Sequence, residues 1–492
     1  MKLTELLSGI ETLQRAGAPE TDITSLGFDS RHATAGQLFF AVKGSASDGH
    51  DYMAQATANG AAAVVCERLP EEPFPGVAYI VVADSSAALG TIASRFYGEP
   101  SHKLKLVGVT GTNGKTTTAT LLYDLFRRLG YKAGLISTVV YRIDNETLPS
   151  THTTPDAIRL NAMLAEMAER GCDYCFMEVS SHSIVQERIA GLTFAGGIFT
   201  NITHEHLDYH GTFAEYIRAK KRFFDHLPKG AFALVNTDNR NGAVMVQNSA
   251  ATTYTYALRS FSDFRCRILE NTPEGMLLEL DGQQVWTRFL GRFNAYNLAA
   301  VYGAARLLGA DCDETLQALS TLTPVNGRFD TLHSPDGITA IVDYAHTPDA
   351  LRNVMDTVNE LRSGAGRLIV VVGCGDRDRT KRPVMAQIAA EGADLALFTS
   401  DNPRHEDPDA ILSEMTATLP DTGRWLTITD RRQAIRAAAA MARKGDYILI
   451  AGKGHETYQI TGDTRTHFDD KEEARKALGM ALPGEDGKPS RQ

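Results

Sequence analysis

The chain has 492 residues, enough for about three domains of ordinary size. Hydrophobic residues make up 43% and charged residues 22%, a balance that excludes wholesale disorder and fibrous repeats. The net charge of -10 disfavours a dedicated nucleic-acid or anionic-membrane binder, although a local basic pocket could still hold phosphate groups.

The N-terminal residues 1–14 carry Glu5 and Glu11 among leucines and predict a short amphipathic helix. They lack the features of an export signal, and no apolar run in the chain reaches the length of a membrane-spanning helix. Six cysteines are too few for a disulfide scaffold, and Cys172 and Cys175 form a CxxC pair without a second pair nearby. We therefore expect a cytoplasmic protein without zinc or redox chemistry at that pair.

The first hundred residues contain short apolar runs at 37–42, 61–66 and 79–82, separated by glycine and proline. Such runs predict strands in a small mixed α/β domain, residues 1–100, followed by a linker at 98–103.

A buried strand is predicted at 104–109, followed by a glycine-rich loop and a helix whose leucines recur at helical spacing up to Leu129. Strand-like and helix-like segments then alternate, which predicts a second domain, residues 101–325, with a mostly parallel sheet of the P-loop type.

The third predicted domain, residues 326–492, has strands at 340–342, 368–372, 395–399 and 447–451. Each strand runs into a polar or glycine-containing loop. This pattern is typical of a Rossmann-like α/β sheet, whose ligands bind beyond the carboxyl ends of the strands.

The strongest local motif lies between the strand at 104–109 and the helix after it. Glycines there allow backbone N–H groups to surround phosphate oxygens, a lysine would neutralise the outer phosphates, and a threonine hydroxyl would bind Mg²⁺. Val109 stands where the general P-loop has its first glycine, and a structural glycine turn is the alternative interpretation. The nucleotide-binding candidates are Gly111, Thr112, Asn113, Gly114, Lys115, Thr116 and Thr117.

Other polar residues follow predicted buried strands. Glu178 could hold Mg²⁺, although a strand-end ion pair is the alternative. Residues 201–210 contain three histidines, but they lack the HExxH spacing and are better interpreted as a polar active-site loop. By charge alone, Lys220 is a helix-surface lysine.

The motif GTNGKTTT resembles that of the Mur ligases and the related folylpolyglutamate synthetases, which join an amine to a carboxylate at the expense of ATP. The resemblance implies that His206 binds a second Mg²⁺ and that Lys220 reacts with CO₂ to form a metal-binding carbamate. Thr116 and Glu178 would complete the metal ligands. It further implies contacts with the nucleotide by Asn297, Arg328, Asp343 and His346.

The third domain carries the sequence Asp401, Asn402, Pro403, Arg404. In tripeptide-forming Mur ligases this motif accompanies meso-diaminopimelate, whose distal carboxylate suits the planar donors of an arginine. A turn with a solvated arginine is the alternative outside this family. The resemblance adds Arg377, Gly452 and Glu456 to the amino-acid site.

The acceptor of the amino acid would be a UDP-N-acetylmuramoyl-dipeptide, held partly by the front domain. The residues implied by the resemblance are Phe28, Ser30, Thr153, Thr154, Ser180, Gln186 and Arg188.

These matches imply an ATP-dependent amide ligase of peptidoglycan precursor synthesis that works through an acyl phosphate. We expect a cytoplasmic monomer with small-molecule substrates, no nucleic-acid or membrane partner, and two Mg²⁺ ions. The alternatives are the same ligase acting on L-lysine, a folylpolyglutamate synthetase, and a P-loop NTPase switch.

Overall fold

The computed structural model describes residues 1–17, 21–44, 47–203, 205, 207–362, 366–376 and 378–482. The chain forms two compact units. The first unit contains residues 1–111, 118–201 and 212–255, and the second contains residues 112–117, 202–211 and 256–492.

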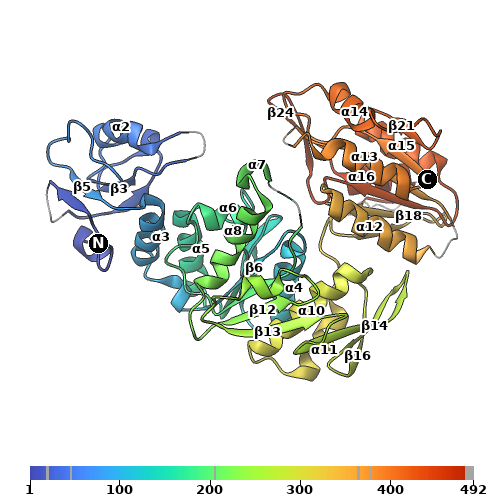
Figure 1. The fold of residues 1–492 in the computed structure, drawn as a ribbon, viewed down its shortest axis with the longest axis horizontal. Helices are drawn as coiled ribbons and strands as arrows, with labels where there is room; N and C mark the ends of the chain where they lie inside the picture. Colours follow the sequence, from blue (N-terminus) through green and yellow to red (C-terminus); the bar gives the residue numbers. More distant parts are fainter. Residues whose placement is uncertain are drawn as a thin grey trace, which may run out of the picture. The chain divides into compact units, whose positions relative to one another are not determined.

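The N-terminal part of the first unit forms a five-stranded sheet, the front sheet, that is buried on both faces (Figure 1). Its helices are α1 (Leu3–Leu6) and α3 (Ser85–Phe96) on one face and α2 (Met53–Ala58) on the other. Its strands, in spatial order, are β1 (Gln14–Ala16), β5 (Ala78–Val81), β4 (Ala63–Cys66), β3 (Gln37–Phe40) and β2 (Ser25–Gly27). The three strands predicted in this region are confirmed.

The N-terminal helix is shorter than predicted. It ends at Leu6, and Gly9 has a φ of +66°, a left-handed conformation in which a right-handed helix does not continue. Gln14 belongs to strand β1, where it pairs with Val81. Leu3, Leu6 and Leu7 are buried against the front sheet, whereas Leu13 is 61% exposed, so the apolar spacing up to residue 14 suggested a longer helix than forms.

The first unit also contains a mostly parallel sheet. In spatial order its strands are β12 (Phe232–Asn236), β11 (Gly196–Phe199), β6 (Lys105–Thr110), β10 (Tyr174–Glu178), β7 (Ala133–Ile136), β8 (Val140–Ile143) and β9 (Glu146–Pro149). The first five of these are parallel to one another, β8 is antiparallel to β7, and β9 is antiparallel to β8. Strands β6 and β10 are neighbours, and Glu178 pairs with Val109. The helices after these strands include α4 (Lys115–Arg128), α5 (Ala157–Glu169), α6 (Ser181–Val185) and α8 (Phe213–Asp225).

The second unit contains an antiparallel meander, β14 (Phe264–Thr272), β15 (Gly275–Leu280) and β16 (Gln283–Thr287), which packs against α10 (Arg292–Leu307) and α11 (Cys312–Thr321). A six-stranded sheet follows, with helices on both faces (Figure 1). Helices α12 (Pro348–Leu361), α13 (Lys381–Gly392) and α14 (Pro408–Thr416) cover one face, and α15 (Arg431–Met441) and α16 (Asp470–Ala477) cover the other.

The strand order of this sheet reverses once. In space the strands are β17 (Asp330–His333), β18 (Thr339–Asp343), β22 (Tyr447–Ala451), β19 (Leu368–Val372), β20 (Leu395–Phe398) and β21 (Trp425–Thr427), and all but β17 are parallel. The chain proceeds outward from β19 to β21 and returns to β22, so the order reverses between β19 and β22. The helices that follow these two strands, α13 and α16, lie on opposite faces of the sheet, and open α/β sheets bind their ligands at such a switch in strand order.

The α/β fold class is thus confirmed: a small front sheet, a mostly parallel central sheet and a Rossmann-like sheet. No helix in the described part of the chain is long and apolar enough to cross a membrane.

Candidate functional site

The loop between β6 and α4 has the backbone that a phosphate loop requires. Gly111 has a φ of +154°, and a Cβ there would lie 2.0 Å from Thr200 Oγ1, so the position accepts only glycine. Gly114, at φ +85°, directly precedes α4. Lys115 Nζ donates to the carbonyl of Thr112 at 2.7 Å. The turn therefore joins a buried strand to a helix N-terminus, an arrangement that favours anions.

Within the second unit, several predicted nucleotide contacts lie together. Arg328 donates to Thr116 Oγ1 at 3.1 Å, and its guanidinium lies over the Tyr344 ring at 4.5 Å. The Tyr344 and His346 rings are 4.6 Å apart. Asn113 donates to Asp349 Oδ2 at 3.1 Å, so this loop has two links to the sheet that carries β18.

Burial changes the ionisation of two residues in this cluster. Burial raises the pKa of Asp343 to about 6, although its Oδ2 accepts a hydrogen bond from the Phe329 N–H at 2.7 Å. Burial and the nearby Lys381 charge lower the pKa of His346 to about 4. A neutral His346 is therefore expected at neutral pH. Asn297, by contrast, donates to Asn294 Oδ1 at 3.2 Å on its own helix α10.

In the first unit, Glu178 has one carboxylate oxygen suited to a metal ion. The residue is fully buried at the end of β10, and Oε1 accepts a hydrogen bond from the Thr138 N–H at 2.7 Å. Its Oε2 is buried without a hydrogen-bond partner in the described part of the chain. Because an unpaired buried carboxylate oxygen is costly, and because Mg²⁺ prefers oxygen ligands, the residue fits a metal ligand.

Lys220 is buried, contrary to the surface position that its charge alone suggested. It lies on α8 with 1% exposure, its Nζ donates to the Gly111 carbonyl at 2.8 Å, and it lies 4.7 Å from the centre of the Tyr216 ring. A lysine is rarely buried without a function or a specific partner. His206 lies outside the described residues.

Four predicted acceptor-binding residues form one network at the carboxyl end of β10. Thr154 Oγ1 donates to the Glu178 carbonyl at 2.7 Å and accepts from the Ser180 N–H at 3.3 Å. Arg188 donates to the Thr154 carbonyl at 2.7 Å and to Gln186 Oε1 at 2.6 Å.

The remaining predicted acceptor residues have separate partners. Thr153 shares a hydrogen bond with Thr138 at 3.0 Å between their hydroxyl oxygens. In the front sheet, Ser30 donates to Gln55 Oε1 at 2.8 Å, and the Phe28 side chain is exposed.

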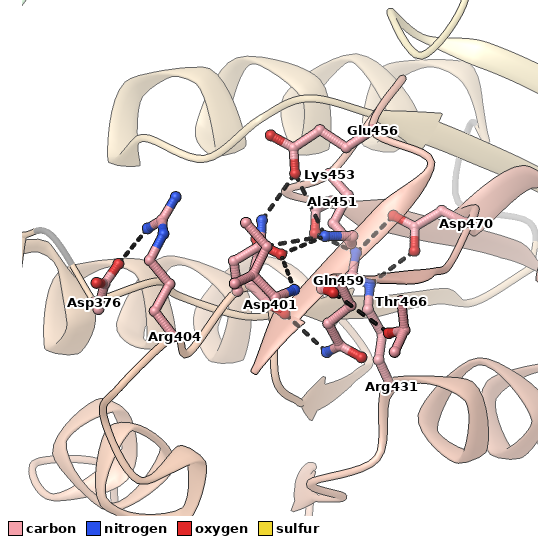
Figure 2. Close-up of polar contacts among 12 residues, drawn as sticks. Asp376, Asp401, Arg404, Arg431, Ala451, Lys453, Glu456, Gln459, Thr466 and Asp470 are labelled. Carbon is pink, nitrogen blue, oxygen red and sulfur yellow. Dashed lines mark hydrogen bonds and ion pairs between the residues drawn. The ribbon is translucent and has the colours of Figure 1, made fainter. Parts of the chain in front are cut away.

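The predicted amino-acid site lies at the carboxyl edge of the six-stranded sheet (Figure 2). Asn402 Nδ2 donates to Glu456 Oε2 at 2.9 Å, which joins the loops after β20 and β22. Gly452 has a φ of +119°, and a Cβ there would lie 2.8 Å from Asp401 Oδ2. Burial and the nearby Asp401 charge raise the pKa of Glu456.

Arg404 is held in place by its backbone and by an ion pair. Its guanidinium bonds to Asp376 in the loop after β19 (Figure 2). The backbone has a φ of +47°, its N–H donates to the Ile460 carbonyl at 3.1 Å, and its carbonyl accepts from the Gly462 N–H at 2.6 Å. A hairpin, β23 (Tyr458–Thr461) and β24 (Thr464–His467), therefore fixes the arginine. Arg377 lies outside the described residues.

Sequence reasoning missed three groups that support this site. Lys453 is fully buried between Asp401, Asn402 and Glu456, and Arg431 forms a buried ion pair with Asp470. Arg382 is also buried and bonds to Glu406, Glu414 and the Gly375 carbonyl, linking the loops after β19 and β20. These are charged side chains, so composition alone assigns them to the surface.

Comparison with known proteins finds Mur ligase family models along most of the chain. Three family models match: "Mur ligase family, catalytic domain" at residues 22–97, "Mur ligase middle domain" at residues 109–305, and "Mur ligase, glutamate ligase domain" at residues 327–454.

Among curated relatives, a protein of Bacteroides thetaiotaomicron is 55% identical over 475 residues, 96% of this chain and 98% of that protein. One of Geobacillus thermodenitrificans is 44% identical over 494 residues, 97% of this chain and 99% of that protein. Both are named UDP-N-acetylmuramoyl-L-alanyl-D-glutamate--2,6-diaminopimelate ligase.

Solved structures also match. One of a ligase with that same name has a TM-score of 0.71 and 33% identity, covering 97% of this chain and 99% of the other. A folylpolyglutamate synthase of Mycobacterium tuberculosis, 17% identical with a TM-score of 0.62, covers 80% of this chain and 96% of the other and shares the fold alone. From the extent and identity of these matches, the chain belongs to the Mur ligase family.

Proposed function

We propose that the chain is an ATP-dependent ligase that adds meso-diaminopimelate to UDP-N-acetylmuramoyl-L-alanyl-D-glutamate in peptidoglycan precursor synthesis. The observation that carries the proposal is the edge of the six-stranded sheet, where Arg404 and Glu456 both lie near the switch in strand order. Arg404 would bind the distal carboxylate of the amino acid, and Glu456 with the Gly452 carbonyl would bind its ammonium. Asp401, Asn402, Pro403 and Arg377 complete the proposed amino-acid site.

A guanidinium and a carboxylate together suit a zwitterionic group better than a lone ammonium. L-Lysine ends in a cation, which Arg404 would repel, whereas diaminopimelate ends in both charges. The relatives' names, which contain 2,6-diaminopimelate, support the same choice.

In the proposed reaction, the γ-phosphoryl group of ATP passes to the side-chain carboxylate of D-glutamate, giving ADP and an acyl phosphate. The neutral amine then attacks the carbonyl carbon, loses its proton and expels phosphate. Lys115 would neutralise charge on the transferring phosphoryl group, and positioning supplies much of the acceleration. The other proposed nucleotide contacts are Gly111, Thr112, Asn113, Gly114, Thr116, Thr117, Asn297, Arg328, Asp343 and His346.

Mg²⁺ would supply further positive charge at the phosphates. The ligands that we propose, for two ions, are Thr116, Glu178, His206 and Lys220 as a carbamate. The unpaired Oε2 of Glu178, in the part of the chain that the structure describes, and the buried position of Lys220 support these choices.

The acceptor would be held by Phe28, Ser30, Thr153, Thr154, Ser180, Gln186 and Arg188. We place the domain boundaries near residues 100 and 325, in keeping with the three segments matched by family models. We further propose a cytoplasmic monomer.

The direct test measures phosphate release from ATP with the UDP-linked dipeptide present, comparing meso-diaminopimelate, L-lysine and no amino acid. The proposal expects release that depends on meso-diaminopimelate. Release that favours L-lysine would identify the lysine-adding ligase, and release that needs no amino acid would indicate an NTPase switch.

A further inference from the structure

The amino-acid site contains a buried cation with no assigned role. Lys453 follows β22, and its side chain is fully buried. Its Nζ lies 3.1 Å from Asn402 Oδ1, 3.4 Å from Glu456 Oε2 and 3.6 Å from Asp401 Oδ1 (Figure 2). A buried ammonium is stable only where anions and acceptors surround it, as they do here.

The lysine fixes the orientation of the Asn402 amide. Asn402 Oδ1 accepts from Lys453 Nζ and from the Ile460 N–H, the latter at 3.0 Å. With its oxygen facing two donors, the amide must present Nδ2 to Glu456 Oε2, at 2.9 Å. Lys453 therefore holds Glu456 both directly and through Asn402.

The Glu456 carboxylate keeps capacity for a ligand. Within the described part of the chain, both of its side-chain hydrogen bonds go to Oε2, and Oε1 receives none (Figure 2). Two carboxylates, Asp401 and Glu456, surround one ammonium, so the cluster has one negative charge in excess. One further ammonium would balance it.

We propose that Lys453 is a positioning residue of the ligase, which keeps Glu456 ionised and oriented so that Oε1 binds the ammonium of the incoming amino acid. The inference rests on the proposed function, because that function supplies the ammonium. Lys453 itself does not contact the substrate; it acts through Glu456 and Asn402.

The charges around Glu456 make the role measurable. Four ionisable groups in the described part of the chain act on the Glu456 carboxylate. Asp401 lies on the loop after β20, and Lys453 lies on the same loop as Glu456. Arg431 adds a positive charge from α15, and Tyr344 lies on the loop after β18. Burial and Asp401 raise the pKa of Glu456, and Lys453 and Asn402 oppose that rise. Loss of the Lys453 charge should therefore let Glu456 take up a proton at higher pH.

The first test is Lys453→Met, which keeps an unbranched side chain only one atom shorter and removes the charge. We expect its KM for meso-diaminopimelate to rise about tenfold or more at neutral pH, with the KM values for ATP and the dipeptide within about twofold of wild type. The pH below which this KM rises should move upward by about one unit. Lys476→Met, which removes an ion-paired lysine of α16, is the matched control and should behave as wild type.

A second variant tests the coupling while retaining Lys453, and so does not depend on Lys453→Met folding. In Asp401→Asn, Glu456 loses an anionic neighbour, and the pH below which the KM rises should move downward. The proposal would be overturned if this pH stays unchanged or moves upward in Asp401→Asn. It would also be overturned if Lys453→Met folds and has the KM and pH profile of wild type. Wild-type enzyme that does not use meso-diaminopimelate would instead refute the proposed function itself.

Discussion

Substituting Gly327 by alanine should disable the proposed amino-acid site from a position outside it. Gly327 has a φ of +67°, and a Cβ there would lie 2.1 Å from the His455 backbone nitrogen and 2.3 Å from the Gly454 carbonyl carbon. These are backbone atoms of the loop that carries Lys453 and Glu456, so a side-chain rotation cannot relieve the clash. The loop itself must move.

The magnitude follows from these distances. A left-handed φ costs an alanine about 1–2 kcal/mol. Relief of the contact requires a shift of about 1 Å, with a packing cost of about 1–3 kcal/mol. We therefore expect a loss of about 2–5 kcal/mol in the free energy of unfolding. Because Glu456 lies on the displaced loop, a misplacement of this size should lower kcat/KM for the amino acid about a hundredfold.

Gly309→Ala is the matched control. Gly309 has a φ of +94°, and a Cβ at this position would meet no heavy atom within 4 Å, so the variant carries the backbone strain without the clash. Urea unfolding and steady-state phosphate release would be measured on both variants. Equal losses of stability and activity in the two variants would refute the reasoning, because the contact with the His455 loop would then contribute nothing.

Three further predictions concern buried or loop charges. The pKa of Asp343 is raised from 3.8 to about 6 in the folded chain, so the folded state binds the extra proton between these values and stability falls as pH rises through them. The loss is on the order of 3 kcal/mol, and Asp343→Asn should remove it in urea unfolding across that pH range. Arg431→Met should lower the free energy of unfolding by about 3–5 kcal/mol, because it leaves the buried Asp470 carboxylate without its cation. The double variant with Asp470→Leu should recover most of that loss. An unrecovered double variant would contradict this account. Lys115→Ala should lower phosphate release by at least about a hundredfold with an unchanged circular dichroism spectrum, and wild-type turnover would disprove its role.

The strands were predictable because their apolar runs are long enough to be buried on both faces. Residues 368–372 and 447–451, for example, are buried throughout β19 and almost throughout β22. That the loops after them lie at one edge was also predictable, because parallel strands end at the same edge of a sheet, and the proposed amino-acid site lies there. The hairpin β23–β24 could not be predicted in this way, because its residues are partly or fully exposed and neither strand contains an apolar run.

The supporting charges of the site were also beyond sequence reasoning. Lys453, Arg431 and Arg382 are ordinary cations in sequence, and their burial depends on carboxylates that surround them only in the folded chain. Lys220 is a similar case. Its charge alone suggested a surface position, only the family resemblance gave it a role in the site, and in the structure it is buried. Local patterns reveal apolar burial, whereas charge burial is decided by tertiary pairing.

The most direct test of the central claim, that Arg404 selects the amino acid through its distal carboxylate, is a competition assay. Wild type and Arg404→Gln would receive equal concentrations of meso-diaminopimelate and L-lysine, and the two tripeptide products would be quantified by mass spectrometry, with the exposed Arg424→Gln as control. The ratio of diaminopimelate to lysine product is expected to fall about 10- to 100-fold in Arg404→Gln alone. An unchanged ratio, with both products reduced equally, would contradict that claim.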